Sequence, residues 1–319
     1  MHDLPGNTES WTRIPISRIE DLRDAVLDAG LEATQMTTDA LTGSLAFIER
    51  RGIIYSSGHI GGTVALLGPL SLDKVTIGVG LHLAPRAWQW MNEVQTGSVG
   101  IFHAGDEHDS HYTPDCLYAA LSIDPDQLEA EAAQQNLTLD RKTLGGTGLH
   151  PQLFDDAVRA NLYQAFSRIH AGQTSGKNST AMVCESMLEA FIGHYARQPF
   201  CANRKVSQSA HARIVRLARA YVLEHLAEPI QLDAIAAAAH ASRRTLYRAF
   251  EEILNDTPQQ FVRRLRLHRI RHDLAGDAER ACTIALVANQ WGISELGRMS
   301  GWYRELFGER PSETLARAH

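Results

Sequence analysis

Three arginines and a tyrosine gather in a short stretch that begins at Ser242. A serine suits the start of a helix, where its hydroxyl accepts a bond from free backbone N–H groups. In a helix over 243–252, Leu246 and Phe250 would face inward and leave the arginines outside. Arginine binds guanine O6 and N7 through two hydrogen bonds, and it neutralises phosphate. The candidate DNA-binding residues of this stretch are Ser242, Arg243, Arg244, Thr245, Tyr247 and Arg248.

The stretch is part of a longer pattern of two predicted helix-turn-helix segments, 231–250 and 283–307. Taken alone, the first segment is explained equally well as an amphipathic helix with a solvated basic face. Its break at His240-Ala241 lacks a glycine, so a residue with a Cβ must supply the turn at some strain. The second segment has Gly292 at its break and Ser294 in a capping position. Its candidate DNA-binding residues are Glu295, Gly297, Arg298 and Arg304.

An arginine-rich helix, from Pro258 to Leu274, is predicted between the two segments. At 1.5 Å per residue its length is about 25 Å. That length suits a strut that holds two recognition helices about one DNA turn apart, on the order of 34 Å. We expect Arg264 on this strut to contact a DNA phosphate.

Several spaced motifs run through the last third of the chain. They are Leu246-x3-Phe250, Thr257-Pro258-x2-Phe261, Arg266-Leu267, Ile284-x2-Val287-Ala288-x3-Gly292 and Phe307-Gly308-x2-Pro311-Ser312. Together, over about 210–318, they resemble the AraC/XylS-type transcription regulators. The resemblance implies that the first recognition helix makes the base contacts, through Arg244, Tyr247 and Arg248.

The second recognition helix departs from that family pattern. Positions that commonly carry polar side chains for base contacts hold Leu296, Gly297 and Gly301. Each glycine costs a helix about 1 kcal/mol relative to alanine. Either the helix backbone approaches DNA closely here, or the helix mainly contacts phosphates and recognises the shape of the duplex. In both cases we expect weaker base readout from this helix. Leu296-Gly297 with Tyr303-Arg304-x-Leu306-Phe307 resembles a subgroup that contains ethanolamine-operon regulators.

Composition indicates a two-domain protein of the cytoplasm. The chain has 319 residues, no apolar run near the roughly 18 residues of a membrane span, and no signal-peptide pattern at its start. Four scattered cysteines, without a C-x-x-C pair, indicate free thiols in a reducing compartment. The net charge of −6 is uneven: Lys205 onward holds 17 basic and 13 acidic residues, the remainder 14 and 24. An acidic sensor joined to a mildly basic DNA-binding domain fits this split.

The amino-terminal half alternates short apolar and polar runs over about 44–123, which indicates a β-sandwich or barrel. The stretch from Gly97 to His108 resembles the second half of a cupin motif, but the first cupin motif is not found. A metal needs three or four convergent ligands, so we expect none and read the histidines as a polar strand-turn or a small-molecule pocket. The candidate pocket residues are Trp88, Trp90, His103, His108, His111 and Tyr112. Amphipathic helices over 153–169 and 182–195 are expected to pack on the barrel and form a dimer seam.

The predicted fold is therefore α+β. An N-terminal β-barrel, cupin-like sensor domain with a helix pair spans 1–198, 199–209 form a linker, and an all-α domain with two helix-turn-helix motifs spans 210–319. The expected function is a DNA-binding transcription regulator, an activator that responds to a small-molecule effector. Its expected partners are promoter DNA, RNA polymerase and a second copy of the chain, without a membrane or cofactor.

Two competing functions stay open at this point. One is a metal-dependent cupin-type enzyme with a helical appendage. The sequence holds no G-x-S-x-G, H-E-x-x-H, P-loop or dinucleotide fingerprint, so no residue is predicted to be catalytic. The other is a DNA-binding protein that works without a ligand.

Overall fold

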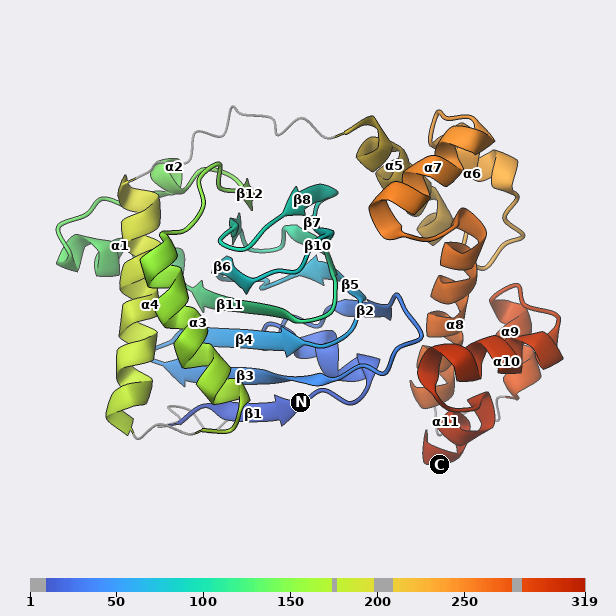
Figure 1. Cartoon of the computed structure of the whole chain (residues 1–319), viewed down its shortest axis with the longest axis horizontal. Coiled ribbons are helices and arrows are strands. Elements are labelled where there is room, and N and C mark those ends of the chain that lie inside the picture. The colour runs from blue at the N-terminus through green and yellow to red at the C-terminus, as the bar shows by residue number, and fades with distance from the viewer. Residues whose placement is uncertain (1–9, 174–176, 198–208, 277–282, 319) are drawn as a thin grey trace. The chain divides into compact units, whose positions relative to one another are not determined.

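A computed structural model describes residues 10–173, 177–197, 209–276 and 283–318. The backbone contacts divide into two compact units, Met1–Ala33 with Leu41–Val206 and Thr34–Ala40 with Ser207–His319. Strands make up most of the first unit and helices the second (Figure 1). The α+β class is confirmed at this level. The predicted linker at 199–209 lies outside the described residues, apart from Ser209.

The strands form two sheets. The larger has the order β1-β3-β4-β11-β6-β9-β12, with antiparallel neighbours throughout, and the smaller has the order β2-β5-β10-β7-β8. The larger sheet consists of β1 (Thr12–Pro15), β3 (Gly43–Arg50), β4 (Ile53–Ile60), β6 (Val75–His82), β9 (Val99–Phe102), β11 (Cys116–Ile123) and β12 (Gly148–Leu149). The smaller consists of β2 (Glu32–Gln35), β5 (Val64–Pro69), β7 (Ala87–Gln89), β8 (Asn92–Val94) and β10 (Glu107–Tyr112).

The described strands do not close into a single barrel, which corrects the barrel in the predicted fold. Closure requires that the first and last strands of one sheet pair. Here β1 and β12 end the larger sheet without pairing with each other, and five strands belong to a separate sheet. Alternation of apolar and polar residues predicts strands but does not show which of them pair.

Residues along the larger sheet alternate between two cores, because successive side chains of a strand point to opposite faces. In β6, Ile77 and Val79 belong to the core that packs on helices, while Gly78 faces the smaller sheet. Helices α3 (Asp156–His170) and α4 (Lys177–Arg197) cover the first face, where Phe166 and Phe191 are fully buried (Figure 1).

The other face packs on the smaller sheet and on the short helix η1 (Ile19–Asp24), through residues such as Leu66 and Tyr118. Helices α1 (Pro125–Gln134) and α2 (Arg141–Leu144) follow β11. The helix pair predicted over 153–169 and 182–195 is confirmed by α3 and α4, with bounds that differ by a few residues.

The second unit is helical. Its elements are α5 (Ala210–Glu224), α6 (Leu232–Ala238), α7 (Arg243–Leu254), α8 (Pro258–Gly276), α9 (Ile284–Gln290), α10 (Leu296–Phe307) and α11 (Pro311–Ala318). His240 separates α6 from α7 with a φ of 50°, so a residue with a Cβ does supply the left-handed turn, as predicted. Gly292 does the same between α9 and α10, with a φ of 68°.

The capping prediction for Ser294 is wrong. The N-cap of α10 is Glu295, and no side chain caps this helix. The Glu295 carboxylate instead lies 2.8 Å from Arg298.

Among the described helices, none is both long and apolar enough to cross a membrane. Cys116 and Cys184 are buried free thiols, whereas Cys201 and Cys282 lie outside the described residues.

Candidate nucleic-acid interface and internal cavity

The amino-terminal end of α7 holds the first set of predicted DNA-binding residues. Ser242 caps the helix, because its Oγ accepts the backbone N–H of Thr245 at 3.1 Å. The two hydroxyl oxygens of these residues lie 2.8 Å apart. Arg243 forms an exposed ion pair with Asp233 of α6, which lowers the pKa of Asp233. Ser242, Thr245 and Arg243 therefore have partners within the protein.

Arg244 and Arg248 differ from their neighbours. They are four positions apart and so lie on the same side of α7. Both are exposed, and within the described part of the chain neither guanidinium has a hydrogen bond or an ion pair. Tyr247, between them, donates its hydroxyl to Gln259 of α8. The start of α7 thus offers two free guanidinium groups to an external acceptor.

The exposed face of α10 is poor in side chains. Gly297 and Gly301 are four positions apart, and a Cβ built on either would meet no atom within 4 Å. Packing inside the protein therefore does not require these glycines. Arg298 is held by Glu295, and Arg304 is exposed. The helix therefore presents an exposed face with little side-chain bulk, next to Arg304, whose guanidinium has no partner within the described residues.

The arginines of α8 turn mainly inward, which changes the expectation for Arg264. Its Nη1 lies 2.5 Å from Asp256 Oδ2, and its side chain is only 18% exposed. A guanidinium held by a buried carboxylate has little surface left for phosphate. Arg271 is buried against Glu309 at 2.5 Å, and Arg263 lies 4.5 Å from the ring centre of Trp302. The sequence shows that α8 is basic but not where its side chains point.

Arg266 joins the two helix pairs of this unit. Its Nε donates to the carbonyl of Leu226 at 3.1 Å, and its Nη2 donates to that of Glu228 at 2.6 Å, both before α6. Its Nη1 donates to the carbonyl of Gly292, in the turn before α10, at 3.2 Å. One side chain of α8 therefore bonds the loop that precedes the first helix pair, α6 and α7, and the turn inside the second pair, between α9 and α10.

Comparison with known proteins shows which family the helical unit resembles. The sequence profile of a helix-turn-helix domain matches residues 235–317. XylDLEGF operon transcriptional activator 2 of Pseudomonas putida is 29% identical over 137 residues, which cover 43% of this chain and 82% of the relative. XylDLEGF operon transcriptional activator 1 of the same species is 24% identical over 231 residues, or 69% and 67% of the two chains. The chain belongs to the AraC/XylS-type transcription regulators.

Members of this family are DNA-binding transcription regulators. Among solved structures, a probable AraC family transcriptional regulator from Rhodopseudomonas palustris is 33% identical. The match covers 33% of this chain and 97% of that one, with a TM-score of 0.32.

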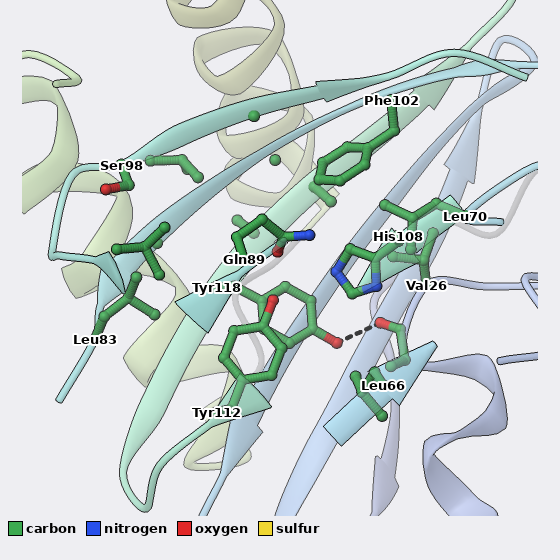
Figure 2. A pocket seen from close by; sticks show the side chains of 18 of the residues that line it. Val26, Leu66, Leu70, Leu83, Gln89, Ser98, Phe102, His108, Tyr112 and Tyr118 are labelled. Atoms are coloured by element: carbon green, nitrogen blue, oxygen red, sulfur yellow. Dashed lines mark hydrogen bonds between the residues drawn. The ribbon is translucent and has the colours of Figure 1, made fainter. Parts of the chain in front are cut away.

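The first unit of this AraC/XylS-type regulator encloses a cavity between its two sheets (Figure 2). The space that the centre of a water molecule can reach inside it measures about 70 Å³. A single buried water needs roughly 10–15 Å³ on this measure, so the cavity holds several waters or a small molecule. Its walls include Leu66, Gly78, Gln89, Phe102, His108 and Tyr118.

Two of the six predicted pocket residues, His108 and Tyr112, line this cavity. The other four do not. Trp90 packs beside Phe102, with ring centres 5.0 Å apart, and donates to the Glu107 carbonyl. His103 lies 2.8 Å from the Gly145 carbonyl, and Trp88 and His111 pair across β7 and β10. Histidines and tryptophans close in sequence thus separate onto different faces of the strands.

The sequence analysis missed Gln89, Phe102 and Tyr118 as cavity residues. Gln89 and Phe102 are direct sequence neighbours of predicted pocket residues but point to the other face, and Tyr118 lies on β11, whose pairing the sequence does not reveal. Burial lowers the pKa of His108 to about 3, so its imidazole is neutral at physiological pH. Burial raises the pKa of Tyr112, which keeps its phenol protonated.

No group of three or more His, Cys, Asp or Glu side chains that could hold a metal ion is found in the described residues. His59, His82 and Asp115 lie together at the surface, with His59 Nε2 at 3.0 Å and His82 Nε2 at 3.9 Å from the carboxylate.

Proposed function

We propose that this regulator inserts α7 and α10 into successive major grooves of promoter DNA and activates transcription in response to a small molecule. The observation that carries the proposal is the pair of free, exposed guanidinium groups of Arg244 and Arg248 at the start of α7. Two such groups on one helical face suit bidentate hydrogen bonds to guanine in the major groove. The predicted domain division, with DNA binding in 210–319, is part of this proposal.

The two recognition helices contribute differently. The first, α7, reads bases through Arg244 and Arg248. The second, α10, carries the bare face of Gly297 and Gly301, which suits close approach to the sugar-phosphate backbone. Arg266 sets the spacing between the two, since it hydrogen-bonds loops or turns beside both pairs.

The small molecule binds in the cavity between the sheets, so the two-sheet unit takes the sensing role expected of a cupin-like domain. An effector changes occupancy or polymerase contact only if it binds one conformation of the regulator more tightly than another. The activator role is supported by the names of the Pseudomonas putida relatives. RNA polymerase and promoter DNA in the cytoplasm are the partners that this role implies.

A second copy of the chain is the further partner that we propose. Met182 on α4 is 68% exposed, and Leu153, just before α3, is 47% exposed. Large apolar side chains at the surface of a helix pair favour association. Sedimentation of the full chain and of Met182→Glu tests this: a dimer that the variant converts to monomer supports the seam, and a monomer in both contradicts it.

Footprinting of the upstream region of the regulator's own gene tests DNA binding. The full chain should protect two patches about one helical turn apart, on the order of 10 base pairs centre to centre. The double variant Arg244→Ala/Arg248→Ala should lose both patches at the concentration that protects with the parent chain. Arg216→Ala, an exposed arginine of α5, is the matched control. A parent chain that protects nothing at low ionic strength contradicts the proposal.

Catalysis is not part of the proposed function, because members of the family regulate transcription. The metal-dependent enzyme is tested by elemental analysis of the purified chain, where stoichiometric metal would favour it. A regulator that occupies its promoter equally with and without every candidate metabolite would favour the ligand-independent alternative.

A further inference from the structure

The cavity exists because three neighbouring strands carry only small residues at positions that pair directly with one another. Ala120 of β11 pairs with Gly78 of β6, and Gly78 pairs with Gly100 of β9. All three residues line the cavity. Cross-strand partners lie side by side on the same face of a sheet. They therefore form a flat floor across three strands, and the ring of Phe102 covers its Gly100 end, since a Cβ built on Gly100 would lie 3.1 Å from that ring.

The smaller sheet supplies the opposite wall, and with it two polar groups. Gln89 of β7 and His108 of β10 are 6% and 4% exposed. In Figure 2 both side chains point into the space beside Phe102. Within the described residues, Gln89 Nε2 and His108 Nδ1 have no hydrogen-bond partner. A buried polar atom left without a partner costs roughly 1–3 kcal/mol, so these two atoms favour an occupant of the cavity that can form hydrogen bonds.

The cavity wall carries no formal charge. Its lining residues include no Asp, Glu, Lys or Arg. His108 is neutral, because burial lowers its pKa to about 3. An ion that enters an apolar cavity without an opposite charge loses its hydration and gains no compensating partner. Carboxylates and ammonium groups are therefore disfavoured, and this includes ethanolamine in its protonated form.

We propose that the cavity binds a small, flat, uncharged molecule whose apolar body ends in a carboxamide-like group. The body lies on Ala120 and Gly78, beside the ring of Phe102. Gln89 Nε2 donates to the carbonyl oxygen of the ligand, and the amide N–H of the ligand donates to His108 Nδ1, with the imidazole proton on Nε2. This ligand class rests on the proposed function of an effector-responsive regulator.

Benzamide, benzoate and benzylamine test the ligand class, because they share a ring and differ in charge. Each is titrated into the full chain in a calorimeter at neutral pH, with ethanolamine as a fourth arm. Benzamide should bind with a dissociation constant of about 1 mM or tighter, a scale that suits so small a ligand. The three charged compounds should bind at least about tenfold more weakly. Absence of saturable benzamide binding, or binding of a charged compound as tight as that of benzamide, overturns the proposal.

Substitutions locate the binding. A Cβ at Gly78 would contact Ala119 O and Ala120 Cβ at 3.7 Å, an ordinary distance, so Gly78→Val fills the cavity without a backbone clash. It should abolish benzamide binding. Gly146→Val, where a Cβ meets nothing within 4 Å, is the matched control outside the cavity and should bind as the parent does. Equal binding by Gly78→Val and the parent chain overturns the assignment to this cavity.

The polar end is tested by Gln89→Leu and His108→Leu. Each substitution should weaken the binding of benzamide about tenfold, which is the effect of one lost hydrogen bond to a buried group. Unchanged affinity in both variants overturns the role of the polar pair. The same preparations are footprinted on DNA. Intact protection with a failed ligand result refutes this inference alone, whereas absent protection in the parent chain refutes the proposed function.

Discussion

The guanidinium of Arg266 and the carbonyl of Gly292 meet at 3.2 Å, in a turn that favours glycine. A Cβ on Gly292 would lie 3.1 Å from Arg266 Cζ, and the backbone there has a φ of 68°. Both facts disfavour a side chain at this position. The turn before α10 is thus fitted to a side chain of α8 that also bonds the loop before α6.

Arg266→Lys should lower the free energy of unfolding by about 2–3 kcal/mol, because an ammonium lacks the planar fork that reaches three carbonyls. Urea unfolding of the full chain measures it. Arg244→Lys, at an exposed position without a partner in the described residues, should change stability by less than about 0.5 kcal/mol. Equal effects of the two substitutions would contradict the bridging role.

Arg248→Ala should weaken binding to the cognate operator by about 1–3 kcal/mol if this residue reads a base. Binding to random DNA should weaken much less. Gel-shift titrations on both sequences measure the difference, with Arg216→Ala as the control. Equal loss on operator and random DNA would reject base readout and leave a phosphate contact.

Arg264→Ala should destabilise the fold rather than reduce phosphate contact. Its removal leaves the carboxylate of Asp256, whose side chain is 4% exposed, without its cation. Breaking such a buried pair costs roughly 3–5 kcal/mol. Thermal unfolding measures the loss, and Asp256→Asn in the same chain should recover part of it. The salt dependence of DNA binding should keep its slope; a shallower slope would restore the phosphate role.

Gly297→Ala and Gly301→Ala should each stabilise the folded chain by up to about 1 kcal/mol, because a Cβ meets open space at both positions. Binding to DNA should weaken at the same time, since the added methyl groups occupy the face that approaches the duplex. Melting temperature and gel shift on the same samples separate the effects. Stabilisation with unchanged affinity would show that α10 stays clear of the DNA backbone.

Stability should fall as the solution is acidified below about pH 6.5. Burial lowers the pKa of His108 to about 3 and those of His170 and His194 to about 4. Each folded-state pKa is depressed, so below 6.5 the unfolded chain binds protons that the folded chain does not. The free energy of unfolding should then drop by about 1.4 kcal/mol per pH unit for each histidine, down to about pH 4.

His108→Leu measures the contribution of His108 to the pH dependence of the free energy of unfolding. Chemical unfolding at several pH values should give a slope smaller by one proton. A slope equal to that of the parent would show that His108 is solvated in the folded state. Gly146→Val serves again as a neutral control.

The helical unit was largely predictable from sequence, because its signals are local. The spacing of Leu246 and Phe250 predicts the buried face of α7, and both residues are fully buried. The turn at His240 and the cap at Ser242 follow from their immediate neighbours. The prediction for Ser294 was wrong because α10 begins at Leu296, which makes Glu295 rather than Ser294 the residue at the cap position.

The direction of long side chains and the pairing of strands could not be predicted. Arg264 and Arg248 look alike in sequence, but a buried carboxylate eight positions before Arg264 captures only one of them. The cavity floor needs Ala120, Gly78 and Gly100 in register, and these residues are up to 42 positions apart along the chain. No local pattern carries that information.

Strand β6 lies between the ligand cavity and the core that packs on α3 and α4. Ile77 and Val79 touch the core beneath α3 and α4, while Gly78 between them forms the floor of the cavity. Close-packed interiors transmit displacement rather than absorb it. A ligand that pushes on Gly78 would therefore also shift Ile77 and Val79, its direct neighbours in the strand. The helix side of the sheet would respond without a chain of further residues between the two faces.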